Sequence, residues 1–373
     1  MKKIIIAPDS FKGTMTAEEV CDILDAAVKR AVPGAETVLI PMSDGGEGMV
    51  AAYTRLLSGE SHSAQVSGPR GEKLACPFGL LPDGTAVAEM AGCAGLPLMG
   101  GQLDPFRAST FGVGELLLAL RDRGCDKVLM GIGGSATCDC GIGMAAALGF
   151  RFLDGEGKEL APYACNIGAV RQILLPEKLE LPEITVACDV DNPLCGPNGA
   201  CAVFGPQKGL QPEEIQPLDE DIKAFAGLIE ERLHVPVLDV PGAGAAGGLG
   251  AALLAFCGAK LTPGIEMLLD ASGIDRELES AALVLTGEGR LDGQSMAGKV
   301  PVGVSRRANR AGVPCLAVCG CIGKGAEAVL SQGISAYYAA SEAGRSMDEL
   351  RKTCRADLAA AADRAMADFL SKK

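Results

Sequence analysis

Short apolar runs alternate with polar, glycine-containing segments along much of the chain. The first run, residues 2–8, is rich in isoleucine and leads into a polar segment and then into a helical pattern. Continuous apolar character with β-branched residues is typical of parallel strands that are covered on both faces. Similar runs recur at residues 37–40, 127–130, 184–187, 282–285, 315–319 and, more weakly, 335–338. The pattern predicts an α/β protein built from strand–loop–helix units.

The helix after the first run has clear signals at its start and along one face. Thr16 and Glu19 have the spacing of a capping box. Apolar residues then recur at helical spacing from Val20 to Val28, and the pattern ends near Pro33. We therefore predict a helix from Thr16. Helical patterns also cover residues 110–123, 211–233, 299–310 and 347–370.

The texture of the sequence changes near Ser63, where short alternating segments with glycine and proline breaks begin. Residues 82–84 (Pro-Asp-Gly) indicate a hairpin between the runs at 74–81 and 85–90. The strand–loop–helix pattern returns at Ala282. We therefore predict two α/β domains: one made of residues 1–63 and 266–373, and an inserted one made of residues 64–265.

Composition narrows the classes of function. The 373 residues are 48% hydrophobic and 22% charged, with a formal net charge of -13. Such a chain is long enough for two domains with ample cores. The negative charge opposes nonspecific binding to nucleic acid or anionic membranes, so we expect neither as a partner. The charge-free stretch at residues 240–259 is mostly glycine and alanine, which makes it a poor membrane span.

The cysteines point to a reducing compartment. The chain has 15 cysteines, a count that is not even, and it is larger than a small secreted disulfide-bonded domain. No signal-peptide pattern precedes the first strand. We therefore expect a cytoplasmic protein without a disulfide framework. Only His62 and His234 could supply imidazole, and no C-x-x-C occurs, so a structural zinc site is not expected. We interpret the C-x-C pairs at 138–140 and 319–321 as small apolar core residues.

The segment at residues 286–299 is the strongest candidate for chemistry. It follows the buried run at 282–285 and carries four charged side chains among glycines: Glu288, Arg290, Asp292 and Lys299. Open α/β sheets bind ligands at the carboxyl ends of their strands. Acids can hold a metal ion, bases can bind an anion, and glycines let backbone amides approach a phosphate. The alternative is a solvated strand-to-helix connection, although such connections are usually shorter.

The common phosphate-binding fingerprints are missing from the sequence. There is no G-x-x-x-x-G-K-[ST], and no G-x-G-x-x-G follows the first strand. Gly242, Gly244 and Gly247 have the dinucleotide spacing, but the short run before them contains Pro236 and Pro241. We therefore disfavour NAD binding, and close packing of a helix explains these glycines equally well.

Several other predicted strand-end loops combine acids, hydroxyls or amides, glycines and bases. They contain Asp9, Ser10 and Lys12; Ser43, Asp44 and Glu47; Ser135 and Asp139; Asp189, Asp191 and Asn192; and Gln207 and Lys208. Each loop alone could be a turn or a helix cap. Phosphoryl transfer needs this combination, because carboxylates must hold Mg²⁺, donors must stabilise charge on the transferred group, and an acid must orient the attacking hydroxyl.

Seven segments resemble, in order, the bacterial type I glycerate kinase family. They are residues 9–13 (DSFKG), 43–48 (SDGGEG), 131–137 (GIGGSAT), 189–194 (DVDNPL), 204–209 (FGPQKG), 241–248 (PGAGAAGG) and 286–295 (TGEGRLDGQS). One loop departs from the family pattern, which usually reads Ser-Ala-Thr-Asn-Asp-Gly-Gly. Here Cys138 replaces the asparagine and Cys140 the first glycine, while Asp139 matches.

The resemblance implies a fold and an activity. It implies a flavodoxin-like parallel-sheet domain built from both chain ends, and an inserted mixed-sheet domain with a restriction-endonuclease-like core. The implied reaction is ATP- and Mg²⁺-dependent phosphorylation of D-glycerate, most often to 2-phosphoglycerate. A kinase that forms 3-phosphoglycerate, a kinase of another small hydroxy acid and a noncatalytic ligand-binding regulator remain as alternatives. Monomer and homodimer are both left open.

We assign roles to the loop residues from their positions. Lys12 or Lys208 is expected to supply positive charge to a phosphate or carboxylate, and Asp189, at a strand end beside Asn192, is expected to act as a base or an orienting residue. Metal ligands are expected among Asp44, Glu47, Glu288 and Asp292. Substrate or phosphate contacts are expected from Asp9, Ser10, Ser43, Gly133, Gly134, Ser135, Asp139, Asn192, Gln207, Arg290 and Lys299.

Overall fold

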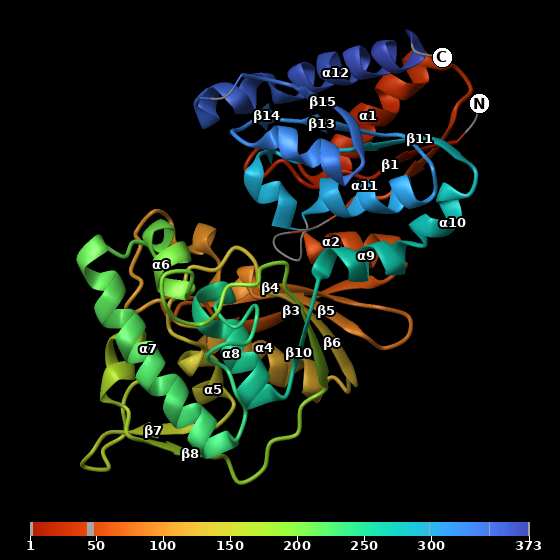
Figure 1. Cartoon of the computed structure of the whole chain (residues 1–373). Helices are drawn as coiled ribbons and strands as arrows, with labels where there is room; N and C mark the ends of the chain where they lie inside the picture. Colours follow the sequence, from red (N-terminus) through yellow and green to blue (C-terminus); the bar gives the residue numbers. More distant parts are fainter. Residues whose placement is uncertain (1–2, 43–47, 298, 343, 372–373) are drawn as a thin grey trace. The chain divides into compact units, whose positions relative to one another are not determined.

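The chain folds into two compact units (Figure 1). The two ends of the sequence together form one unit, and the middle of the sequence forms the other. A computed structural model describes residues 3–42, 48–297, 299–342 and 344–371. The terminal unit comprises residues 1–44 and 263–373, and the inserted unit comprises residues 45–262.

The terminal unit is built on a five-stranded parallel sheet in the order β2-β1-β11-β13-β15. Its strands are β1 (Lys3–Ile6), β2 (Glu36–Leu39), β11 (Ala281–Thr286), β13 (Cys315–Cys319) and β15 (Ile334–Ala339). Numbered within the unit, this is the 2-1-3-4-5 order of flavodoxin-like sheets. The predicted flavodoxin-like fold class is therefore confirmed. The strand order reverses between β1 and β11, and this is where such sheets bind ligands.

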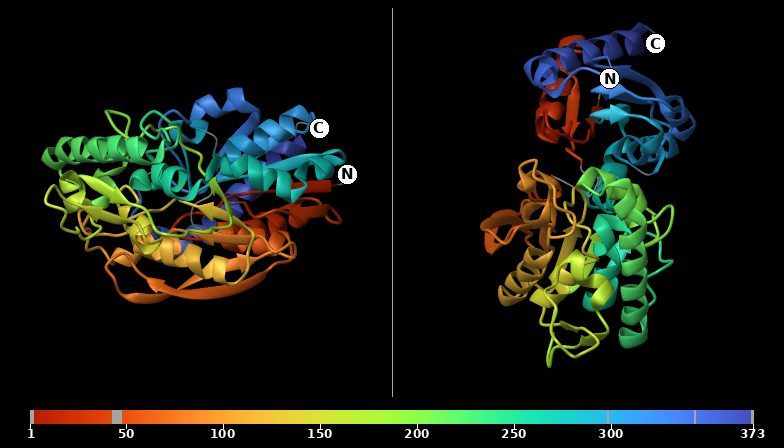
Figure 2. Two further views of the ribbon diagram at one scale, coloured as in Figure 1. Left: turned by 90° about the horizontal axis from the view of Figure 1, so that it is seen from below. Right: turned by 90° about the vertical axis from the view of Figure 1, so that its left-hand side faces the viewer.

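Helices cover both faces of this sheet. They are α1 (Ala17–Ala31), α9 (Gly264–Ser272), α10 (Ile274–Leu278), α11 (Val300–Arg310) and α12 (Met347–Ser371). Side chains alternate between the faces of a strand, so Ile4 and Ile6 pack with α1 and α12, which lie side by side (Figure 2). Ala317 and Cys319 pack with Val302 of α11 on the other face.

The predicted start of α1 is confirmed. Glu19 donates its backbone N–H to the Thr16 hydroxyl, and the Glu19 carboxylate accepts the N–H of Thr16. Smaller elements complete the terminal unit: β12 (Arg290–Leu291) pairs with β14 (Cys321–Ile322), and η4 (Gly293–Ala297) and η5 (Ala326–Gln332) are 3₁₀ turns.

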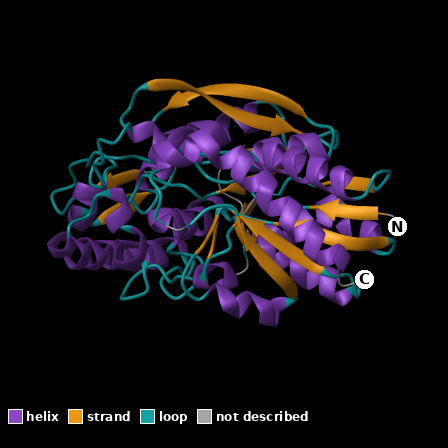
Figure 3. Ribbon diagram, turned by 90° about the horizontal axis from the view of Figure 1, so that it is seen from above, coloured by secondary structure: helices purple, strands orange, loops and turns teal. Residues whose placement is uncertain are grey.

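The inserted unit has a six-stranded mixed sheet in the order β10-β9-β6-β5-β4-β3. Its strands are β3 (Glu60–Ser67), β4 (Lys73–Leu80), β5 (Ala86–Glu89), β6 (Lys127–Gly131), β9 (Glu183–Ala187) and β10 (Lys260–Thr262). β5, β6, β9 and β10 run parallel, whereas β3 and β4 form the antiparallel edge (Figure 3). The hairpin predicted around residues 82–84 is the β4–β5 pair. The predicted mixed sheet is also confirmed.

Helices and a small strand pair pack around this second sheet. They are α2 (Met49–Leu56), α3 (Ala91–Ala94), α4 (Phe111–Asp122), α5 (Ile142–Ala147), α6 (Ala200–Phe204), α7 (Pro212–Leu233) and α8 (Ala245–Cys257), with 3₁₀ turns η1 (Leu96–Met99), η2 (Ala164–Ala169) and η3 (Pro206–Lys208) and strands β7 (Arg151–Leu153) and β8 (Gln172–Leu174). One core joins sheet residues such as Phe78 and Val128 to Leu117 of α4 and Leu253 of α8.

Helix α2 explains where the units divide. The sequence texture placed the change near residue 63, whereas the compact units divide at residues 44/45 and 262/263. The Glu89 carboxylate at the end of β5 accepts the backbone N–H groups of Gly48 (3.1 Å) and Val50 (2.5 Å) at the start of α2. A carboxylate is favourable at a helix N-terminus. This contact fixes α2 to the inserted unit, although α2 precedes the first strand of that unit.

Among the helices that the structure describes, none combines the length and the apolar character that crossing a membrane would require.

Candidate functional site

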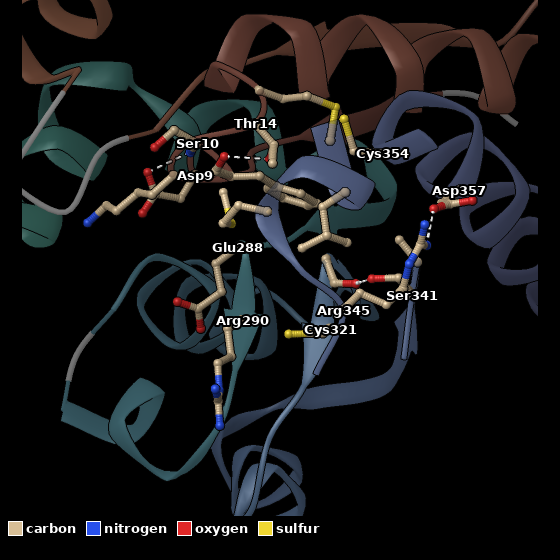
Figure 4. A pocket seen from close by; sticks show the side chains of 18 of the residues that line it. Asp9, Ser10, Thr14, Glu288, Arg290, Cys321, Ser341, Arg345, Cys354 and Asp357 are labelled. Atoms are coloured by element: carbon tan, nitrogen blue, oxygen red, sulfur yellow. Dashed lines mark hydrogen bonds and ion pairs between the residues drawn. The ribbon is translucent and has the colours of Figure 1, made fainter. Parts of the chain in front are cut away.

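The terminal unit has a pocket at the carboxyl edge of its sheet (Figure 4). Its volume is about 460 Å³. The loops after β1, β11, β13 and β15 and the first turns of α12 form its walls. We call it the sheet-edge pocket. It lies where the strand order reverses, as expected for a flavodoxin-like ligand site, and its volume is within the range of small-molecule sites.

Glu288 is a nearly buried carboxylate in the wall of the sheet-edge pocket. It follows β11, and only 5% of the residue is exposed. The Ser295 hydroxyl donates a short hydrogen bond to Glu288 Oε1, and the Lys299 ammonium lies 3.5 Å from Oε2. These contacts fix the carboxylate beside a base. The structure therefore brings together two of the side chains that the sequence singled out in segment 286–299.

The loop after β1 meets the loop after β11. Asp9 donates its backbone N–H to the Gly287 carbonyl (2.8 Å), and its Oδ1 accepts the N–H of Ser10 (2.7 Å). Thr286 ties the strands together one step earlier, because its hydroxyl donates to the Ala7 carbonyl at 2.8 Å. Asp9, Ser10 and Lys12 all line the sheet-edge pocket, and Lys12 is exposed. The acids and bases of two distant segments therefore share one pocket.

Glycines let these loops pass at very short range. A Cβ atom on Gly287 would lie 2.0 Å from the Val318 carbonyl oxygen, and one on Gly320 would lie 2.4 Å from the Gly289 carbonyl oxygen. Real Cβ atoms do not tolerate such contacts, so a side chain at either position would push the loops after β11 and β13 apart. These glycines therefore allow the close approach of the loops after β11 and β13.

The remaining charged residues of segment 286–299 form a pair. The Arg290 Nε lies 3.0 Å from Asp292 Oδ2, and the Arg290 side chain is largely exposed. Arg290 lines the sheet-edge pocket. Asp292 also donates its N–H to Ser295, which in turn contacts Glu288. Asp292 therefore supports the loop that carries Glu288, and its expected role as a metal ligand stays a prediction.

A second group of candidate residues lies in the inserted unit, after β6. Lys208 is almost fully buried, with 1% exposed, and its ammonium donates to the Ser135 hydroxyl (2.6 Å) and the Thr137 carbonyl (2.7 Å). Burial lowers the pKa of the Lys208 ammonium. Gly133 and Gly134 precede Ser135 in the same loop, and Gln207 beside the lysine is exposed. Lys208 thus braces the glycine loop, and its expected contact with substrate stays a prediction.

Asp139 is buried in the segment after the glycine loop and accepts several hydrogen bonds. Its carboxylate accepts the N–H and hydroxyl of Thr110 (both 2.8 Å) and the N–H groups of Gly141 (3.2 Å) and Gly143 (3.3 Å). Burial raises the pKa of this carboxyl, and the hydrogen bonds from Thr110 and the glycines oppose that rise. The four donors favour a structural role: Asp139 ties the start of α4 to the start of α5.

Replacement of Asp139 by asparagine should therefore lower stability. An amide group cannot accept at both positions, so at least one buried N–H donor would lose its acceptor, at a cost of about 1–3 kcal/mol. Urea denaturation followed by circular dichroism measures the free energy of unfolding. Asp126→Asn, an exposed acid of the same unit, is the control and should change it by less than about 0.5 kcal/mol. Equal stability of both variants would contradict the structural role.

The loop after β9 carries Asp189 and Asn192. Both residues are half-buried. The Asn192 side chain donates to the Asn198 carbonyl at 2.8 Å, and its backbone carbonyl accepts the N–H of Gly244 at 3.0 Å. Because β6 and β9 are adjacent and parallel, the Asp189 loop and the glycine loop after β6 leave the same edge of the sheet.

The glycine-rich segment at the start of α8 packs against both of these loops. A Cβ atom on Gly244 would lie 2.2 Å from the Pro193 carbonyl oxygen, and one on Gly247 would lie 2.0 Å from that of Thr137. Cys140 donates its N–H to the Gly247 carbonyl at 3.0 Å. Close packing, the alternative that the sequence analysis raised for this spacing, therefore accounts for these glycines.

Some expected residues fall outside the described part of the chain, and some contacts were not expected at all. Ser43, Asp44 and Glu47 lie outside the described residues. The sequence analysis missed the pocket wall on α12, where Met347, Leu350 and Cys354 line the sheet-edge pocket. Their spacing of three and four residues was visible in the sequence, but core-facing helix residues have the same spacing.

Within the described ranges, no group of three or more histidine, cysteine, aspartate or glutamate side chains is arranged to hold a metal ion. Mg²⁺ does not need such a group, since one or two carboxylates commonly hold it together with substrate phosphates. Glu288 and Asp9, from adjacent loops that line one pocket, fit that kind of site.

Comparisons with known proteins agree over nearly the whole chain. The sequence model of the Glycerate kinase family matches residues 4–370. A glycerate kinase of Halalkalibacterium halodurans is 43% identical over 354 residues, which cover 94% of this chain and 93% of the relative. A protein of Escherichia coli K12 named glycerate 2-kinase is 41% identical over 352 residues, covering 93% and 92%.

A solved structure shows the same fold. A protein of Salmonella typhimurium LT2 that carries the name glycerate kinase 2 superposes with a TM-score of 0.83 at 38% sequence identity. The superposition covers 100% of this chain and 99% of the other. The similarity therefore extends over both units.

Proposed function

Because the chain belongs to the glycerate kinase family, we propose that it transfers the γ-phosphoryl group of ATP to D-glycerate and forms 2-phosphoglycerate. One observation carries the choice of product: the relative from Escherichia coli named glycerate 2-kinase matches over more than nine-tenths of both chains. The 3-phosphoglycerate-forming kinase and the kinase of another small hydroxy acid remain as alternatives. A noncatalytic regulator fits less well, because it should lack coherent Mg²⁺ ligands, whereas two carboxylates, Asp9 and Glu288, line the sheet-edge pocket.

The chemistry of the sheet-edge pocket supports this proposal. Glu288 and Asp9 would hold Mg²⁺, which when bound supplies charge neutralisation for the phosphates. Lys12 and Lys299 would attract the phosphate oxygens, which the negative net charge of the protein otherwise repels. The tightly packed glycines of the adjacent loops would hold these groups in place.

The residues of the inserted unit would serve the acceptor. We propose that Asp189 accepts the proton of the glycerate hydroxyl while the hydroxyl oxygen bonds to the γ-phosphorus and ADP departs. Asn192 and the glycine loop that Lys208 contacts would orient the D-glycerate. Lys208 would act through Ser135, since its ammonium is buried against that loop.

The proposed setting is the cytoplasm. All 15 cysteines are free thiols in this structure, and most of them are buried. Free thiols persist in reducing compartments.

The product can be identified with coupling enzymes. The two hydroxyl groups of glycerate lie on adjacent carbons, so the way its carboxylate is held decides which oxygen faces the γ-phosphate. We expect D-glycerate, ATP and Mg²⁺ to yield phosphoenolpyruvate at once when enolase free of phosphoglycerate mutase is added. Phosphoenolpyruvate that appears only after mutase is added would assign the 3-kinase reaction instead. If no glycerate-dependent ADP forms, the kinase proposal is wrong.

A further inference from the structure

The sheet-edge pocket has two chemically different ends. Asp9 and Glu288, from the loops after β1 and β11, lie on one side, and Cys354 and Asp357 of α12 lie on the other (Figure 4). The first end carries acids, bases and glycine backbone, which suit a metal ion and phosphates. The second end is mainly apolar, and the roles proposed so far leave it unused.

Five side chains make up the apolar end: Phe11, Met15, Met347, Leu350 and Cys354. Phe11, Met15 and Cys354 are buried, whereas Met347 is 42% exposed at the first residue of α12. A Cβ atom on Gly13 would lie 2.8 Å from the Met347 Cε, so this methionine reaches across to the loop after β1. Both ends of the chain therefore build one apolar wall.

An arginine and an aspartate beside this wall balance each other in charge. The Arg345 guanidinium lies 2.9 Å from the Asp357 carboxylate and donates to the Thr353 hydroxyl at 2.9 Å. The Thr353 hydroxyl and the Arg345 guanidinium lower the pKa of Asp357. The Ser341 hydroxyl donates to the Gly320 carbonyl at 3.0 Å, which leaves its oxygen able to accept a hydrogen bond. This end therefore offers apolar surface and hydrogen bonding, with little net attraction for an anion.

Only one part of the proposed substrates suits such a surface. D-glycerate is a small polar acid, and the triphosphate is highly charged. The adenine ring is flat and weakly polar, and it carries ring nitrogens and an amino group at its edge. Methionine and aromatic side chains provide polarisable, adaptable contact surfaces for such rings.

We propose that the apolar end of the sheet-edge pocket, formed by Phe11, Met15, Met347, Leu350 and Cys354, binds the adenine ring of ATP. The triphosphate then extends along the loops after β1 and β11 towards Glu288. This inference rests on the proposed use of ATP as donor. It places the adenine-binding site in the terminal unit, whereas the sequence motifs alone do not say which unit binds adenine.

The test compares two ligands by isothermal titration calorimetry, with the full-length protein and Mg²⁺ but without glycerate. Met347→Ala and Leu350→Ala should each weaken ATP binding about fivefold to tenfold, which corresponds to about 1–1.4 kcal/mol. The affinity for inorganic tripolyphosphate, which has no base, should stay within twofold. Leu330→Ala and Leu370→Ala are matched controls, since these leucines of the terminal unit are 46% and 37% exposed and lie outside the pocket wall. Both controls should bind ATP as the unchanged protein does.

Photolabelling with 8-azido-ATP locates the base independently of any substitution. We expect the labelled peptides to come from residues 11–15 and 347–354. Labelling confined to residues 45–262, unchanged ATP affinity in both pocket variants, or equal loss of ATP and tripolyphosphate affinity would each overturn the inference.

The outcomes also separate this inference from the proposed function. If glycerate-dependent ADP formation proceeds but the pocket variants bind ATP normally, the adenine assignment fails and the kinase proposal stands. If the variants lose ATP affinity selectively but no glycerate is phosphorylated, the adenine assignment stands and the kinase proposal fails.

Discussion

Replacement of Glu288 by glutamine should lower kcat for glycerate phosphorylation by about a hundredfold or more, which corresponds to about 2.7 kcal/mol of transition-state stabilisation. Glutamine keeps the size of the side chain, and its carbonyl oxygen can still accept the Ser295 hydroxyl. It loses the charge that we propose for Mg²⁺, together with the ion pair to Lys299. Steady-state kinetics over a range of Mg²⁺ concentrations should show a lower kcat and a higher half-saturating Mg²⁺ concentration.

Two further variants separate a metal ligand from a support of the loop. Glu342→Gln is a matched control, because Glu342 is an exposed acid in the wall of the same pocket, and it should keep nearly native kinetics. Ser295→Ala removes the hydrogen bond but leaves the Glu288 charge, so its loss of kcat should be much smaller than that of Glu288→Gln. Equal losses in the Ser295 and Glu288 variants, with an unchanged Mg²⁺ requirement, would show that Glu288 only holds the loop.

The strand-end loops could be predicted from sequence because two local signals coincide there. A continuous apolar run indicates a parallel strand, and glycines with charged residues directly after it indicate an edge loop. The run at 282–285 and the segment at 286–299 became β11 and the Glu288 loop. The order of strands is a different matter, since periodicity does not say which strands pair. Only the structure shows that β1 and β11 are neighbours and that Asp9 contacts Gly287.

The burial of polar side chains could not be predicted from the sequence. Lys208 and Asp139 were identified as candidate site residues because they sit in glycine-containing loops. The structure buries both and surrounds them with partners such as Ser135 and Thr110. A buried charge needs such partners to offset the loss of hydration. Those partners come from segments far away in the chain, so no local sequence pattern predicts these contacts.

The apolar wall on α12 could not be recognised from the sequence because its residues have the spacing of core residues. Met347, Leu350 and Cys354 follow the spacing of one helix face, which usually means core packing. Residues further along the same helix, such as Leu358 and Ala362, are fully buried against the sheet. The face is continuous, and only its first turns leave the sheet and border a cavity. Local spacing cannot distinguish these two environments.

The inserted unit supplies the second residue with a large expected effect. Asp189 follows β9, at the edge from which the glycine loop after β6 also leaves. The Asn192 side chain donates to the Asn198 carbonyl, and the glycine-rich segment at the start of α8 packs against both loops. A carboxylate in such a fixed loop can accept a proton with little reorganisation. Asp189 is half-buried at the strand end, whereas Asp191 is exposed, and this difference favours Asp189 as the proposed base.

Asp189→Asn should therefore lower kcat by about a hundredfold to ten-thousandfold, the range for loss of a general base, while the affinity for ATP and Mg²⁺ stays within about threefold. Kinetics at saturating substrates measure the first quantity, and calorimetry without glycerate measures the second. Asp191→Asn removes an acid two residues away and should retain most of the activity. If the Asp189 variant instead loses ATP affinity and keeps kcat at saturation, the residue belongs to the nucleotide site, and the proton must go to another acceptor.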